Sequence, residues 1–214
     1  MTDISNIATT MEEQVNQDSP EWQQIKKNTK FSLKIEGKTS NKVQVIDRGE
    51  NLKFANNWKV YVHNSDSSDW TLKSYDSDFF VIENISDFMQ FFSNFSKFNF
   101  RQHNMFIMKQ KDDGEFIIPM WEDPMNRNGS TCSIRVDSQS GVELMQQICI
   151  LMFNNALTSN PSIINGISYS VKTQYAIIKI WLSTIENIEK SLPDTILQKY
   201  GNYNMRSKPN EPEY

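Results

Sequence analysis

The order of strand-like and helix-like segments most limits how this chain can fold. Patterns typical of strands occur at residues 58–63, 77–84, 104–110, 132–137, 164–172 and 175–183. Apolar residues recur at helical spacing at residues 85–95, 141–157 and 184–201. Because strands and hairpins are interrupted by helices rather than alternating strictly with them, the order favours an α+β fold. In such a fold the helices pack on one face of an antiparallel sheet, and the other face is free to bind a ligand.

The two ends of the chain differ from its middle in composition and in hydrophobic periodicity. Residues 1–50 are polar, charged and weakly periodic, which predicts a flexible N-terminal extension. One folded domain is predicted over residues 51–205, followed by an open C-terminal tail at 206–214. The last helical pattern, 184–201, is expected to be interrupted near Pro193.

Composition argues against several classes of protein. The net charge of −4 and the pI of about 5.3 argue against broad, charge-driven nucleic-acid binding, although a small nucleotide site is compatible with them. No apolar run is long enough to span a bilayer, and the first residues lack an apolar signal region. Cys132 and Cys149 are the only cysteines, so we expect no disulfide framework and a reduced, cytoplasmic protein.

Residues that carry catalysis or bind metals are sparse. His63 and His103 are the only histidines, and with two isolated cysteines they give no metal-ligand spacing. The sequence contains no phosphate-binding loop, dinucleotide fingerprint or nucleophile elbow. We therefore predict a binding protein that is not an enzyme and needs no cofactor or metal. A nucleotide-processing enzyme that uses Glu122 and Asp123 is the less favoured alternative.

Two tryptophans stand in polar, irregular segments. Trp70 follows SDSSD, and Trp121 lies in IIPMWEDPMNRNG, where a core ring would normally lie in a periodic apolar segment. Two such rings can sandwich a flat base, and a cationic base gains a further cation–π attraction. Glu122 can accept the N1–H and amine of guanine, an arrangement that adenine lacks. A core ring and a solvated acid are the alternative interpretations of these residue types.

The motif PMWED at 119–123, with N..G after it and I.DF at 85–88 before it, resembles the translation initiation factor 4E family of mRNA cap-binding proteins. The resemblance covers about residues 52–205. It implies a curved antiparallel sheet of about eight strands with three long helices on its convex face. It also implies a monomer without membrane contact whose concave face binds the 7-methylguanosine cap of mRNA and recruits the message to translation initiation.

The resemblance assigns roles to individual residues at the base. Trp70 and Trp121 match the rings that sandwich the methylated base, and Glu122 matches the acid that accepts from guanine. Trp181 matches the ring that touches the N7-methyl group.

The phosphate contacts depart from the family pattern. Lys172 occupies the position of a phosphate-binding arginine, but Ile177 replaces the family's second lysine. Strand alternation places Lys179 on the side of Trp181, so Lys179 is one substitute and Arg127 in the Trp121 loop is another. Either could instead be an ordinary surface charge.

The partner surface also departs from the family. The resemblance implies that an initiation-factor 4G-type scaffold, or a peptide like those of the 4E-binding proteins, docks on the helices. Met89 stands where the family has a tryptophan, whereas Ile85 and Ile150 match aliphatic contacts. Met89 could instead be ordinary helix packing. These changes leave open a repressor that binds caps without recruiting ribosomes.

Overall fold

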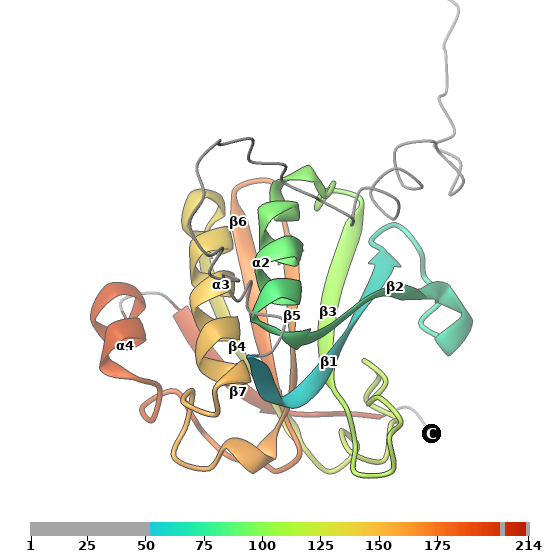
Figure 1. Cartoon of the computed structure of the whole chain (residues 1–214). Coiled ribbons are helices and arrows are strands. Elements are labelled where there is room, and N and C mark those ends of the chain that lie inside the picture. Colours follow the sequence, from blue (N-terminus) through green and yellow to red (C-terminus); the bar gives the residue numbers. More distant parts are fainter. Residues whose placement is uncertain (1–51, 202–203, 213–214) are drawn as a thin grey trace, which may run out of the picture. The chain divides into compact units, whose positions relative to one another are not determined.

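A computed structural model describes residues 52–201 and 204–212, and the extension predicted at 1–50 lies outside them. The α-helices and strands in this part are β1 Lys53–Asn64, β2 Tyr75–Asn84, α2 Ile85–Ser93, β3 His103–Lys109, β4 Ser130–Asp137, α3 Ser138–Phe153, β5 Ile164–Val171, β6 Tyr175–Leu182, α4 Asp194–Tyr200 and β7 Asn204–Pro209 (Figure 1). Single 3-10 turns lie at Leu72–Ser74, Phe95–Lys97 and Pro161–Ile163.

The described residues form one antiparallel sheet of seven strands in the order β2-β1-β3-β5-β6-β4-β7. This curved sheet with three α-helices confirms the predicted fold class, and the strand count is close to the eight expected. Strands β5 and β6 form a hairpin, with its turn at Lys172–Gln174 between the paired residues Val171 and Ala176.

Local capping explains where two of the helices begin. Asn84 ends β2 and accepts a bond from the Asp87 amide at 2.9 Å, while the Asp87 carboxylate accepts from the Asn84 amide at 3.3 Å. The Asp137 carboxylate likewise accepts from the amides of Gln139 and Ser140, so β4 runs directly into α3.

Helices α2 and α3 lie side by side on one face of the sheet, which we call the helical face (Figure 1). Phe153 of α3 packs on Trp58 of β1 with ring centroids 4.9 Å apart and on Phe88 of α2 at 6.0 Å. Trp58 is therefore a core residue. No helix within the described ranges is long and apolar enough to cross a membrane.

The opposite face, which we call the open face, carries its own aromatic cluster. Its buried members are Tyr61, Tyr75, Phe106, Met108, Ile117 and Trp181. Directly paired residues share a face, and Tyr61 pairs with Phe106 while Met108 and Trp181 both pair with Gly166. A Cβ at position 166 would lie 2.5 Å from the Ile107 carbonyl oxygen, so only glycine fits this crossing point.

The last helix is shorter than the sequence pattern indicated. Residues 184–193 form bends and turns, and α4 begins only after Pro193, which serves as its N-cap. Proline has no amide hydrogen to donate and disfavours helical geometry in the preceding residue, so the predicted helix cannot pass through this point.

The C-terminal tail predicted from residue 206 is also wrong in its first part. Residues 206–209 belong to β7, which pairs with the edge of β4 from Arg135 to Ser130. The segment has little apolar alternation, because Met205 is its only large apolar side chain. This strand forms because its backbone pairs with the free edge of β4, and not because its own sequence has a strand pattern.

Candidate functional site

Trp70 is held by a buried histidine beneath it. The rings of Trp70 and His63 stack with centroids 3.9 Å apart and planes 10° apart, while 49% of Trp70 stays exposed. His63 Nε2 lies 2.8 Å from the Asp69 carbonyl oxygen, and since a carbonyl only accepts, Nε2 carries the hydrogen. The side chain of Asp69 in turn accepts from the Thr71 amide, which lowers the pKa of Asp69. Trp70 is thus fixed in place before any ligand binds.

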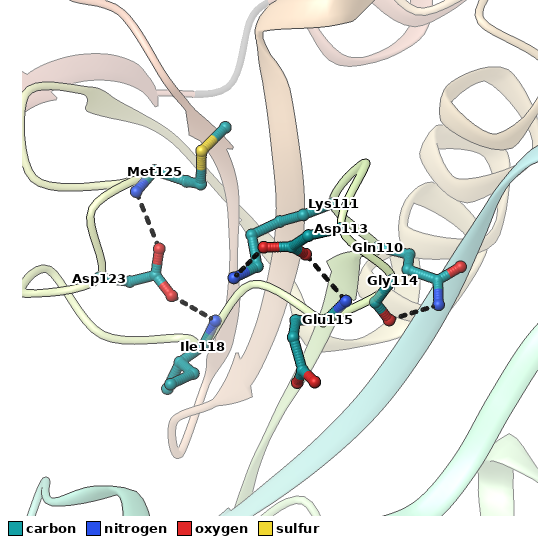
Figure 2. Close-up of polar contacts among 8 residues, drawn as sticks. All are labelled: Gln110, Lys111, Asp113, Gly114, Glu115, Ile118, Asp123 and Met125. Carbon is teal, nitrogen blue, oxygen red and sulfur yellow. Dashed lines mark hydrogen bonds and ion pairs between the residues drawn. The ribbon is translucent and has the colours of Figure 1, made fainter.

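The loop that carries Trp121 is braced by Asp123. The Asp123 carboxylate is buried and accepts from the amides of Ile118 at 2.9 Å and Met125 at 2.8 Å (Figure 2). Asp123 therefore has a structural role in this loop. The braced loop presents Trp121, which is 36% exposed, and the half-buried Glu122 next to it.

Three buried asparagines tie the same loop to distant parts of the fold. Asn126 donates from Nδ2 to the carbonyls of Ile118 and Met120 at 2.9 and 2.8 Å. Asn165 of β5 donates to the Asn126 side chain at 3.0 Å, and Asn210 donates to the Asn126 carbonyl at 2.7 Å. The buried part of this irregular loop satisfies its polar groups through side chains of the loop itself, of β5 and of the residue just beyond β7.

Tyr75 connects the two tryptophan-bearing loops. Its hydroxyl donates to the Pro119 carbonyl at 3.0 Å, and its ring centroid lies 6.4 Å from that of Trp70. Burial and then the nearby charge of Glu122 raise the pKa of Tyr75. Tyr75 therefore links Trp70 to the loop that carries Trp121 and Glu122, although the two segments are far apart in sequence.

Trp181 lies deeper in the open face than the two loop tryptophans. It is buried, its Nε1 donates to Ser168 Oγ at 3.2 Å, and its ring lies 6.2 Å from Phe106. Phe106 is in turn 5.6 Å from Tyr75, so one aromatic chain joins Trp181 to the site. The contact of Trp181 with an N7-methyl group stays a prediction.

The structure brings together two of the three cations predicted for phosphate binding. Lys179 shares the open face with Trp181, and burial together with the charges of Lys172 and Lys208 lowers the pKa of Lys179. Arg127 is exposed in the Trp121 loop, where its amide donates to the Asp123 carbonyl at 2.9 Å. Among the residues that the structure describes, no hydrogen bond or ion pair links Arg127 to Lys172 or Lys179.

The three residues predicted to bind a partner are exposed on the helical face. Ile85 and Met89 lie one turn apart on α2, and Ile150 lies on α3. With 56% of its surface exposed, Met89 is not ordinary core packing. Ile150 also lines a shallow hollow between α3 and α4, together with Leu151 and Ile196.

Sequence reasoning missed several residues that build this site. Strand alternation places His63 on the same face of β1 as Tyr61, so the sequence did contain a signal that His63 lies on the open face. Asn126 belongs to the N..G motif, but its bonding role was not inferred. Nothing in the sequence pattern points to Asn165, Asn210 or Tyr75.

Comparisons with known proteins identify the family to which the chain belongs. The family model for eukaryotic initiation factor 4E matches residues 53–207. The chain therefore belongs to the eukaryotic initiation factor 4E family. A comparison with curated protein sequences finds no match.

Solved structures share the fold at low sequence identity. The chain resembles Caenorhabditis elegans eIF4E-3, solved with the 4E-binding protein Mextli and a cap analog, at 15% identity and a TM-score of 0.59, over 76% of this chain and 98% of that one. It resembles schistosome eIF4E, solved with m7GpppA and a 4E-BP, at 18% identity and a TM-score of 0.58, over 74% and 87%. Ascaris suum eIF4E-3 with an m7G cap gives 17% identity and a TM-score of 0.54, over 75% and 92%.

Proposed function

We propose that this protein binds the 7-methylguanosine cap of mRNA on its open face. Trp70 and Trp121 sandwich the methylated base, Glu122 accepts from guanine, and Trp181 contacts the methyl group. Lys172 and Lys179 bind the phosphate bridge, and Arg127 is a further candidate. The observation that carries the proposal is that Tyr75 joins an exposed Trp70 to the loop that carries Trp121 and Glu122 in a chain of this family.

Physical chemistry supports this assignment. Stacking of a base on an aromatic ring contributes about 1–3 kcal/mol, and a ring that is already fixed loses little entropy on binding. His63 and Asp123 supply that fixation for the two loops. The structural relatives that were solved with m7G caps or cap analogs add independent support.

The helical face would carry the second activity, which is recruitment through a scaffold or a peptide like those of the 4E-binding proteins. Ile85, Met89 and Ile150 are exposed apolar residues there, and relatives were solved with 4E-binding proteins. A cap-binding repressor remains the alternative, favoured by methionine at position 89. Pull-down on 7-methyl-GTP resin distinguishes the two, because only a recruiting protein should bring ribosome-bound initiation factors with it.

Tryptophan fluorescence tests the cap assignment directly. Titration with 7-methyl-GTP should give at least about tenfold tighter binding than titration with GTP, since only the methylated base is cationic. The Trp121→Ala variant should remove most of this preference. Equal affinity of the wild type for both nucleotides would reject cap binding.

A further inference from the structure

Basic side chains lie on the open face between the site already described and the β7 edge of the sheet. Lys179 of β6 pairs with Ser133 of β4, which pairs with Arg206 of β7. In the next row, Trp181 pairs with Thr131, which pairs with Lys208. Directly paired residues share a face, so Arg206 and Lys208 lie on the same face as Lys179 and Trp181.

The spacing suits a ligand that extends past the cap phosphates. Neighbouring strands lie about 4.8 Å apart, so β7 lies about 10 Å from β6. Arg206 and Lys208 are exposed, and the hydroxyl-bearing residues Ser133 and Thr131 lie between them and β6. Together they continue the line of donors that begins at Lys179.

Arg135 adds a planar donor to the same surface. Its guanidinium carbon lies 3.7 Å from the centre of the Tyr175 ring, so the group is held flat against an aromatic face. Arg135 pairs with Ile177 of β6, which alternation places on the same face as Lys179. A flat guanidinium presents paired N–H donors that match the geometry of a phosphate group.

Within residues 52–201 and 204–212, no acidic side chain forms an ion pair with Lys172, Lys179, Arg135, Arg206 or Lys208. Asp137, at the end of β4, is engaged in capping α3. In a protein of net charge −4, an unneutralised row of cations on one face is a local attraction for an anion.

We propose that the β7 side of the open face, formed by Arg135, Arg206 and Lys208, binds the backbone phosphates of the first nucleotides that follow the cap. The inference rests on the proposed cap site, because the row begins at the lysines assigned to the cap phosphates. Contacts of this kind read the charge of the strand and not its sequence, so we expect little dependence on the bases.

The experiment compares 7-methyl-GTP with a capped pentanucleotide. The double variant Arg206→Gln/Lys208→Gln should keep its affinity for 7-methyl-GTP and lose about tenfold for the capped pentanucleotide. The slope of log affinity against log salt for the pentanucleotide should fall by about 1.4, since each contact to a single strand contributes about 0.7. The double variant Lys97→Gln/Lys190→Gln, which changes the net charge equally with both residues exposed, should behave as wild type.

Two results would overturn the inference while leaving cap binding intact. In one, the wild type binds 7-methyl-GTP and the capped pentanucleotide with equal affinity. In the other, the Arg206→Gln/Lys208→Gln variant loses 7-methyl-GTP affinity to the same extent, which would assign these residues to the cap's own phosphates. Failure of the wild type to prefer 7-methyl-GTP over GTP would instead refute the proposed function itself.

Discussion

At the scale of single residues, adjacent acids have different surroundings. Asp123 accepts from two loop amides, whereas the charge of Glu122 acts on the phenol of Tyr75. Neighbouring positions in the sequence therefore do not imply a shared function. The isosteric substitutions Glu122→Gln and Asp123→Asn separate the roles of the two acids.

Glu122→Gln should weaken 7-methyl-GTP binding by about tenfold to hundredfold, because a charge-assisted acceptor for guanine is lost. Its melting temperature should fall less than that of Asp123→Asn, because Asp123 is buried and Glu122 is only half-buried. Asp123→Asn turns one acceptor into a donor that faces an amide, and should lower the melting temperature by about 3–8 °C. Fluorescence titration and thermal unfolding of both variants provide the test. If Asp123→Asn proved the more damaging to affinity without any loss of stability, the two roles would be reversed.

The sequence could predict those site residues that stand out within their own short segment. Trp70 and Trp121 stand out because large apolar rings are unusual in polar, irregular segments, and Glu122 stands out because it directly follows Trp121. The stacking of His63 under Trp70 was not predictable, because it depends on how residues 64–69 fold back over β1. Tyr75 likewise depends on the meeting of two loops that are distant in the chain.

At the scale of elements, β7 has a role beyond completing the sheet. Asn210, directly after it, donates its amide to the Gly129 carbonyl at 3.0 Å and its side chain to the Asn126 carbonyl at 2.7 Å. A Cβ on residue 129 would lie 1.9 Å from the Leu182 carbonyl oxygen, so the loop closes tightly against β6 at this point. The C-terminal strand thus helps to hold the loop that carries Trp121.

Asn210→Ala should lower the melting temperature by about 2–4 °C, because the buried Asn126 carbonyl loses a donor. It should also weaken 7-methyl-GTP binding about threefold, because a looser loop must be ordered on binding. Asn128→Ala, at an exposed position in the same loop, is the matched control and should change neither quantity. Unchanged stability and affinity in the Asn210 variant would show that β7 does not brace the site.

Helices and strands whose apolar residues recur at a clear spacing were predictable from the sequence, and elements without such a spacing were not. The apolar spacing of α2 and α3 and the alternation of β1, β5 and β6 agree with the observed elements. The helical spacing at Ile188 and Leu192 was misleading, because both residues are buried without lying in a helix. The Asn187 side chain accepts from the Glu189 amide there, which favours a turn over helix continuation.

At the scale of the whole molecule, the two predicted activities lie on opposite faces of one sheet. The open face holds the tryptophan site, and the helical face exposes Ile85, Met89 and Ile150. The main core fills the layer between the sheet and the helices, with Trp58, Phe88 and Phe153 in contact. Because a rigid packed layer separates the faces, binding at one should be separable from binding at the other.

Met89→Asp tests this separation. A carboxylate at the centre of the exposed trio would have to be desolvated beneath an amphipathic helix, so affinity for a 4E-binding-protein peptide should fall at least about a hundredfold. Affinity for 7-methyl-GTP should stay at the wild-type value, because position 89 lies on the helical face. Ser96→Asp makes the same charge change at an exposed position beyond α2 and should leave both affinities unchanged. Met89→Trp should raise peptide affinity, because a larger apolar anchor buries more surface. Loss of 7-methyl-GTP binding in Met89→Asp with an unchanged melting temperature would show that the faces are coupled, and full retention of the peptide would remove Met89 from the partner surface.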